Sequence, residues 1–152
     1  MKNYILQDNN NNEFNFSDYQ ENNFLGLIIF RGAWCNLCKK QLKEIQELLS
    51  DFTNLNVKLL AISPDSKLKS SLLKTFLKVQ FPILSDEKME VINDFNILEN
   101  FKGQQLPKPA IFLYNPDGQL ILEKIGDNYE DSLSGKNILK EFSKVIKLAK
   151  IS

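Results

Sequence analysis

The strongest constraint on the fold is the apolar run LGLIIF at residues 25–30, which leads directly into a pair of cysteines. A short continuous apolar run is typical of a strand buried on both faces, as in a sheet covered by helices. An amphipathic helix is predicted from the cysteines to about residue 52, because apolar side chains recur there at helical spacing, at Cys38, Leu42, Ile45 and Leu49. The run therefore predicts a strand-to-helix junction that contains both cysteines.

Strands and helices continue to alternate after this junction. Residues 56–62 are predicted to form a second strand, and residues 81–86 a short third one. The helix between them is predicted to turn one apolar stripe inward, made of Leu68, Leu72 and Phe76. A short helix should follow the third strand and carry Met89, Ile92 and Phe95.

The C-terminal part of the chain predicts a hairpin and a last helix. The segments PAIFLY and QLILEKI flank NPDG at residues 115–118, a tight-turn sequence, so these two strands should be antiparallel neighbours. The last helix has its apolar stripe at Leu139, Phe142, Ile146 and Ala149. Together these elements predict a mixed sheet with helices on both faces. We expect one domain over residues 1–152, with residues 1–13 as an N-terminal extension.

Composition removes several classes of function. The chain has no histidine, which excludes Ser-His triads, His-assisted cysteine proteases and His-ligated zinc. Its two cysteines cannot complete a four-thiolate shell alone, so no metal or other bound cofactor is expected. The 19 basic residues match the 19 acidic ones, which disfavours nucleic acid and anionic membranes as partners. No apolar run approaches a signal peptide or a membrane span, so we expect a cytoplasmic protein.

Cys35 and Cys38 are the candidate catalytic residues. A Cys-x-x-Cys at a strand-to-helix junction puts the first sulfur at a helix N-terminus, where the positive end of the dipole favours a thiolate. The pKa of Cys35 should therefore fall, which makes it the predicted nucleophile at the exposed start of the helix. Cys38 should point inward one turn later, close enough to form a disulfide, and is the predicted resolving thiol.

Two neighbours of the cysteines are candidate substrate-binding residues. Arg31 is the only arginine of the chain and the first candidate for a positive charge beside Cys35. Trp34 is a candidate for shaping the surroundings of the nucleophile, although packing alone would explain it equally well. Two inert core thiols, or a metal site shared between two chains, stay open as alternatives to a redox centre.

The segment FRGAWCNLC resembles the active-site segment of thioredoxin-fold proteins, most closely the peroxiredoxin-like branch of the alkyl hydroperoxide reductase/thiol-specific antioxidant family. The segments LLAISPDS, FPILSD and PAIFLYNPDGQLI are also similar to that family, so the likeness covers about residues 14–148. It implies a thioredoxin-like three-layer α/β sandwich. It also places the cis-proline of the fold at Pro109, facing the active cysteine, with the backbone of Lys108 pairing with a substrate chain.

Three positions depart from the family's pattern. Gly32 stands where typical peroxiredoxins carry a Thr that positions peroxide, and Ile29 where thioredoxins carry a buried acid. The late region that would hold a distant Arg contains Tyr129 and no Arg. Neither catalytic set is complete, so thiol oxidoreductase is a firmer prediction than any one substrate.

The resemblance implies an enzyme that reduces peroxides or disulfides through the two cysteines. Cys35 would attack the substrate, Cys38 would close a disulfide, and a thioredoxin- or glutathione-type reductant would restore the dithiol. The alternatives are a general disulfide reductase with little peroxidase activity and a non-catalytic binding module. A homodimer is compatible with either reading.

Overall fold

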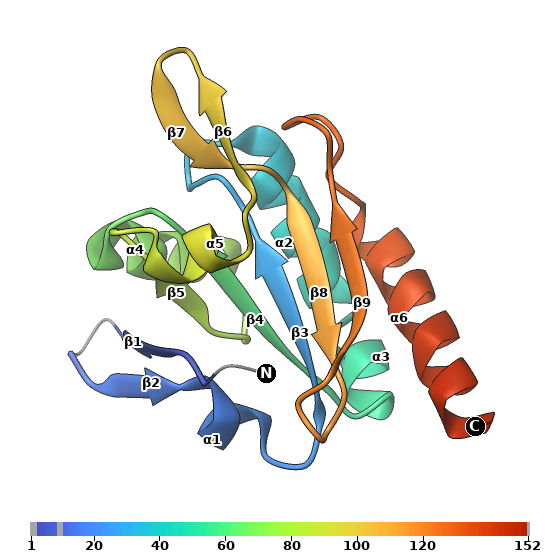
Figure 1. Cartoon of the computed structure of the whole chain (residues 1–152). Helices are drawn as coiled ribbons and strands as arrows, with labels where there is room; N and C mark the ends of the chain where they lie inside the picture. Colours follow the sequence, from blue (N-terminus) through green and yellow to red (C-terminus); the bar gives the residue numbers. More distant parts are fainter. Residues whose placement is uncertain (1–2, 9–10, 152) are drawn as a thin grey trace.

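The computed structural model describes residues 3–8 and 11–151, and its centre is a five-stranded mixed sheet (Figure 1). The strand order across the sheet is β5 (Ile83–Ser85), β4 (Val57–Ser63), β3 (Phe24–Ile29), β8 (Ala110–Tyr114) and β9 (Leu120–Ile125). β3, β4 and β5 run parallel, whereas β8 is antiparallel to both β3 and β9. The predicted hairpin and the predicted mixed sheet are both confirmed.

Helices cover both faces of this sheet (Figure 1). One face is packed by α2 (Asn36–Glu47), α3 (Leu49–Asn54), α4 (Lys67–Leu77) and α6 (Gly135–Ile151). The other face is packed by α1 (Phe16–Gln20) and α5 (Glu90–Asp94), together with the hairpin of β1 (Ile5–Gln7) and β2 (Glu13–Asn15). The side chains of β3 alternate between the two cores, with Ile28 in the first and Leu27 in the second. This strand is therefore buried on both faces, as its apolar run predicts.

The helix predicted after the cysteines is split in two at Leu48. The Leu48 N–H bonds to the carbonyl oxygens of Glu44 and Ile45, at 3.2 and 3.1 Å, so the last turn of α2 tightens before α3 begins. Phe52 of α3 still reaches the core. The split lies about three turns after Cys38, so it leaves the cysteines at the predicted place.

The apolar stripe predicted to face inward on α4 is wrong. Leu68, Leu72 and Phe76 are exposed, and the buried side chains are Leu73 and Leu77 together with that of Ser70. Both sets recur at helical spacing, so periodicity alone does not choose between them. Tertiary contacts decide which set is buried. Leu73 and Leu77 pack in the core with residues that follow them in the chain, such as Val79 and Ile83.

The last helix follows its prediction in part. Phe142 and Ile146 of α6 are buried, Leu139 is half-buried, and Ala149 is exposed. Ile138 takes the remaining core position of this helix. The stripe therefore begins one residue earlier than predicted and ends before the last turn.

Two hairpins are absent from the sequence prediction. The first, β1–β2, lies within and just after the expected N-terminal extension, of which residues 1–2 and 9–10 are outside the described part, and its Leu6 and Phe14 pack on the second core. The second consists of β6 (Leu98–Phe101) and β7 (Gln104–Pro107), and it projects beyond the end of the sheet (Figure 1). Its turn residues Lys102 and Gly103 both have positive φ, 52° and 82°, which is typical of a two-residue hairpin. Among the described residues, no helix is both long and apolar enough to cross a membrane.

Candidate active site

Cys35 is the N-cap residue of α2. Its Sγ accepts a hydrogen bond from the backbone N–H of Cys38 at 3.3 Å, which satisfies one of the free donors of the first turn. The Cys35 side chain is only 5 % exposed, so the expectation of an exposed helix start is wrong. It is buried because the loop before the helix folds inward, with Phe30 in the same core cluster.

Cys38 lies on the buried face of α2, as predicted. Its Sγ accepts a hydrogen bond from the backbone N–H of Arg31 at 3.5 Å, and both cysteines are free thiols. Cys35 and Cys38 therefore lie together at one end of the sheet, linked to each other and to the strand that precedes them. This geometry suits a disulfide between neighbours on one helical turn.

The two thiols differ in acidity. The pKa of Cys35 is lowered to about 6, chiefly because the Cys38 side chain donates a hydrogen bond to it. The backbone N–H of Cys38 and the charge of Arg31 lower that pKa further, whereas burial of Cys35 acts in the opposite direction. The pKa of Cys38 is raised, because its thiol proton is held by Cys35 and because the group is buried. At neutral pH Cys35 is then the thiolate and Cys38 the thiol.

The loop that carries Cys35 is held by Asp65, which follows β4. The Asp65 Oδ2 atom accepts a hydrogen bond from the backbone N–H of Ala33 at 2.7 Å, and the Asp65 side chain is buried. This contact joins the end of β4 to the start of α2 and fixes the approach to the cysteines. The sequence analysis did not select Asp65, although its place in a turn directly after a buried strand is a usable signal.

The position of Gly32 has no room for the threonine that typical peroxiredoxins carry there. Its φ is +155°, and a Cβ atom at this position would lie 2.5 Å from Trp34 Nε1 and 3.0 Å from Asp65 Oδ1. No side chain fits without moving the indole, so a hydroxyl cannot be offered from here. Any group that binds a substrate oxygen must come from elsewhere in the site.

Arg31 is enclosed by three aromatic rings. Its guanidinium carbon lies 4.5, 4.4 and 4.6 Å from the ring centres of Trp34, Phe101 and Tyr129. The residue is only 4 % exposed, and its Nε and Nη2 atoms have no hydrogen-bond partner among the described residues. Cation–π attraction offsets part of the cost of burying the charge. The enclosure leaves two hydrogen-bond donors free beside the thiolate that the charge stabilises.

The aromatic enclosure joins segments that are distant in sequence. Phe101 comes from the β6–β7 hairpin and Tyr129 from the segment after β9, and their rings are 5.3 Å apart. The structure therefore brings the predicted residues Arg31 and Trp34 together at the redox centre. The sequence analysis missed Phe101, and it noted Tyr129 only for the absence of an arginine near it.

A cavity of about 560 Å³ opens beside this enclosure. Its walls include Arg31, Trp34 and Phe101, and Lys69 of α4 stands at its edge. Neither cysteine lines the cavity, so a small molecule in it would meet the Arg31 side of the redox centre.

Lys108 and Pro109 do not line this cavity. The Lys108 N–H already donates to the carbonyl oxygen of Ile97 at 2.7 Å, and the Pro109 carbonyl accepts from the Gly126 N–H at 2.9 Å. The described peptide bonds are all trans, the Lys108–Pro109 bond included, which differs from the cis-proline that the resemblance implied. The Lys108 N–H is therefore already paired within the chain, and the substrate-binding role expected of Lys108 and Pro109 stays a prediction.

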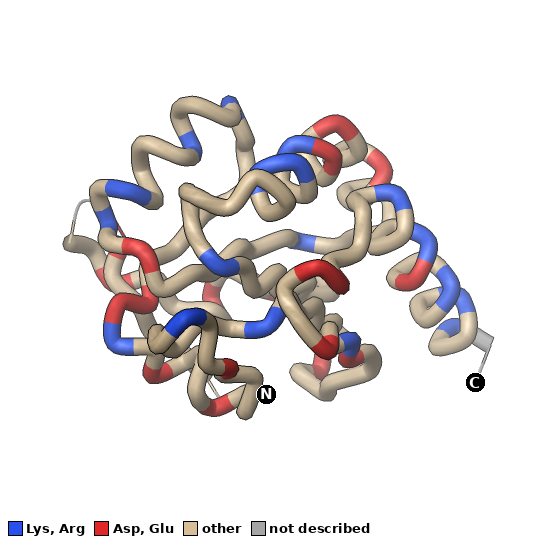
Figure 2. The backbone as a smooth tube through the Cα atoms, turned by 90° about the horizontal axis from the view of Figure 1, so that it is seen from above, with Lys and Arg blue, Asp and Glu red and all other residues tan. Residues whose placement is uncertain are grey.

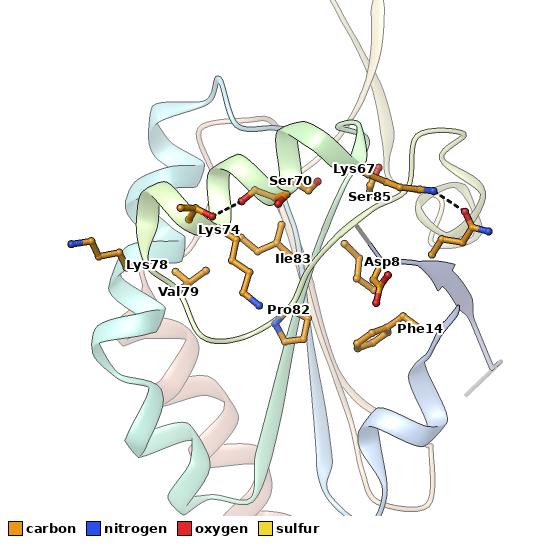
Figure 3. A pocket seen from close by; sticks show the side chains of 14 residues that line it. Asp8, Phe14, Lys67, Ser70, Lys74, Lys78, Val79, Pro82, Ile83 and Ser85 are labelled. Atoms are coloured by element: carbon orange, nitrogen blue, oxygen red, sulfur yellow. Dashed lines mark hydrogen bonds between the residues drawn. The ribbon is translucent and has the colours of Figure 1, made fainter. Parts of the chain in front are cut away.

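A larger hollow, of about 590 Å³, lies apart from the cysteines, between α4, β5 and the β1–β2 hairpin (Figure 3). Neither cysteine lines it, whereas Ser70, Lys74 and Ile83 do. It occupies the side of α4 that faces the sheet edge, so the redox centre and this hollow are separate features of the molecule.

Comparison with known proteins agrees with this geometry. A model of the AhpC/TSA family matches residues 1–122. Thiol-disulfide oxidoreductase ResA of Bacillus thuringiensis subsp. konkukian is 24% identical over 134 residues, which cover 86% of this chain and 70% of that protein.

Solved structures with the same fold include two from bacteria. Peroxidoxin BcpB from Mycobacterium tuberculosis has a TM-score of 0.84 at 17% identity, covering 97% of this chain and 94% of that one. AhpC of Enterococcus faecalis has a TM-score of 0.84 at 16% identity, covering 99% and 92%. These matches confirm the predicted thioredoxin-like α/β sandwich.

Proposed function

Because this chain belongs to the AhpC/TSA family, we propose that its thiol-dependent oxidoreductase activity runs through Cys35 as nucleophile and Cys38 as resolving thiol. The observation that carries the proposal is the asymmetry of the pair. Cys35 is the helix N-cap with a pKa of about 6, and Cys38, one turn later, keeps its proton. An attacking thiolate and a protonated partner are what a two-step thiol reaction requires.

With a peroxide, the Cys35 thiolate attacks one oxygen of the O–O bond, which breaks. The sulfur becomes a sulfenic acid and the other oxygen leaves as an alcohol or water once it gains a proton. The Cys38 thiol then attacks the Cys35 sulfur, forms the disulfide and releases water. Two electrons and two protons from an external thiol reductant restore the dithiol.

With a disulfide, the same thiolate attacks one sulfur, and the S–S bond breaks to give a mixed disulfide and a free thiol. Cys38 then attacks Cys35, closes the Cys35–Cys38 disulfide and releases the second thiol. This second candidate is favoured by the similarity to the thiol-disulfide oxidoreductase ResA. The peroxide reaction is favoured by the burial of Cys35 and by the free Nε and Nη2 donors of Arg31, which suit a small substrate with an oxygen to bind.

Arg31 and Trp34 complete the proposed site. The charge of Arg31 lowers the pKa of Cys35, and its buried Nε and Nη2 donors, which have no partner among the described residues, would bind a peroxide oxygen that enters the enclosure. Trp34 covers one face of the guanidinium and so holds it in this position. The sequence predicts a cytoplasmic protein, and in the cytoplasm thiols are kept reduced. This location stays a prediction.

Steady-state turnover tests the proposal. The parent, with dithiothreitol as reductant, should reduce hydrogen peroxide or a small disulfide, and the ratio of the two rates identifies the preferred substrate. Cys35→Ser should abolish both reactions. Cys38→Ser should form no intramolecular disulfide, so its oxidised Cys35 stays a sulfenic acid or mixed disulfide until dithiothreitol attacks it directly, and intact mass after one equivalent of oxidant, before reductant is added, shows this. A Cys35→Ser protein that turns over like the parent would exclude the proposed roles.

A further inference from the structure

The hollow of about 590 Å³ between α4, β5 and the β1–β2 hairpin takes no part in the thiol chemistry proposed above (Figure 3). Its volume lies in the range that is usual for small-molecule sites. It shares no lining residue with the cavity beside Arg31, and neither cysteine lines it. A molecule bound here would therefore occupy a second site, and the side chains of the lining indicate its chemistry.

The wall that α4 contributes to the hollow is basic. Residues 67–78 carry four lysines and no acidic residue, and Figure 2 shows this helix with blue segments only. Three of the four lysines, Lys67, Lys74 and Lys78, line the hollow. The acid in the described lining is Asp8, whose Oδ1 atom accepts a hydrogen bond from the Asn12 N–H at 3.0 Å. The positive charges outnumber the negative one, so the lining favours an anion.

The three lysines of the lining are not equivalent. The Lys67 ammonium donates to Gln7 Oε1 at 2.7 Å and to Asn11 Oδ1 at 2.8 Å, so it holds the hairpin against α4. Lys78 is exposed and extends away from the hollow in Figure 3. Lys74 is half-buried and extends into the hollow, and its ammonium has no hydrogen-bond or ion-pair partner among the described residues. Lys74 is therefore the cation that a bound anion would meet.

A buried hydroxyl lies one helical turn before Lys74. Ser70 is 2 % exposed and lines the hollow, and its Oγ atom has no hydrogen-bond partner among the described residues. Buried side-chain polar atoms in proteins are nearly always hydrogen-bonded, so an unpaired one at the wall of a cavity points to a ligand. Residues four apart in a helix are neighbours on one face. The Ser70 hydroxyl and the Lys74 ammonium are thus placed to bind the two oxygen atoms of one carboxylate.

The rest of the lining includes a large apolar surface. Val79, Ile83 and Leu84 line the hollow and are buried in the fold, and Phe14 of β2 lines it from the hairpin (Figure 3). A hydrocarbon ring or chain would remove this surface from water, whereas a small inorganic anion would leave it uncovered. The lining therefore fits a molecule with one anionic end and an apolar body.

We propose that this hollow is a binding site for a small organic carboxylate with an apolar body. The carboxylate accepts hydrogen bonds from the Ser70 hydroxyl and the Lys74 ammonium, and the body lies on Ile83 and Leu84. This site goes beyond the proposed function and does not depend on it, because binding here needs neither cysteine.

Calorimetric titration of the reduced protein with 4-phenylbutyrate tests the site. The uncharged analogue 4-phenylbutanamide should bind about tenfold more weakly, because it cannot form an ion pair with Lys74. Lys74→Met and Ser70→Ala should each weaken the binding of 4-phenylbutyrate about tenfold, since each removes a hydrogen bond to a charged group. Lys69→Met is the matched control. It removes the same charge from α4, but at the cavity beside Arg31, and should leave binding unchanged.

Thermal unfolding without the probe separates a binding role of Ser70 from a structural one. Ser70→Ala removes a hydroxyl that has no partner, so its melting temperature should be no lower than that of the parent. A clear drop would show that the hydroxyl is used within the fold, and would overturn its role as a ligand-binding group.

The titrations can overturn the proposal in four ways. The parent may bind no 4-phenylbutyrate at millimolar concentration, or may bind the amide as tightly as the acid. Inorganic phosphate that competes with the probe would show a site for anions of any kind. Binding that is weakened by Lys69→Met and not by Lys74→Met would place the probe in the cavity beside Arg31.

Discussion

Replacing Arg31 by Met should raise the pKa of Cys35 and slow its reactions most at low pH. Met is the suitable replacement because its unbranched chain can fill the space among the three rings without a charge. The Cys35 pKa is about 6, and the Arg31 charge ranks below the two hydrogen bonds from Cys38 among the causes that lower it. We therefore expect a rise of about one unit, which is about 1.4 kcal/mol of lost thiolate stabilisation.

The loss of reactivity depends on pH, because it follows the fraction of Cys35 that is present as the thiolate. At pH 7 a rise of this size takes the thiolate fraction from about nine-tenths to about one half, a twofold loss. At pH 6 the fraction falls from about one half to about one-tenth, a fivefold loss. Above about pH 8.5 the two proteins should carry nearly the same thiolate fraction.

Two assays separate the two roles of Arg31. Alkylation by iodoacetamide against pH, together with the ultraviolet absorbance of the thiolate, reports the pKa alone. The rate with hydrogen peroxide also reports how the oxygen is oriented, so a loss that persists at high pH measures that second role. Lys40→Met, at an exposed position of α2, removes a nearby charge outside the enclosure and should leave both curves unchanged. An Arg31→Met protein that titrates and reacts like the parent would show that Arg31 is a packing residue only.

Three further changes have defined outcomes. Cys38→Ala should raise the pKa of Cys35 more than Arg31→Met does, because it removes the side-chain hydrogen bond from Cys38, which lowers that pKa most. Cys38→Ser keeps a hydroxyl donor and should raise it less; alkylation against pH measures both. Gly32→Ala should displace the indole of Trp34 and cost about 1–3 kcal/mol of stability, seen as altered tryptophan fluorescence and a lower urea midpoint. Leu73→Ala should cost about 2–5 kcal/mol, since it opens a cavity in the core, and a thermal melt no lower than that of the exposed Leu72→Ala would contradict the packing described for α4.

The parts of the fold that were predictable from sequence are those set by neighbours in the chain. The run at residues 25–30 is apolar at nearly every position because both faces of β3 are covered, and the spacing of the cysteines fixes them on one turn of α2. The turn at residues 115–118 likewise fixes the β8–β9 hairpin within a few residues. In each case the signal that identifies the element lies within one short segment.

What could not be predicted depends on contacts between distant segments. Phe101 and Tyr129 reach Arg31 only through the β6–β7 hairpin and the segment after β9, and neither residue is distinguished by its own surroundings in the sequence. The β6–β7 hairpin stands largely outside the core, so it lacks a clear alternation of apolar and polar residues. On α4 two apolar stripes share the helical spacing, and only contacts with distant segments decide which of them is buried.

The central claim, that Cys35 and Cys38 act as one redox pair, is tested most directly by the intact mass of the protein after oxidation. The reduced chain, treated with a small excess of hydrogen peroxide and then with an alkylating agent under denaturing conditions, should be lighter by two hydrogen atoms and should take up no alkyl group. That result requires a disulfide between the only two cysteines of the chain, within a monomer. A protein that instead carries two added oxygen atoms on Cys35, with Cys38 still open to alkylation, would contradict the two-thiol mechanism.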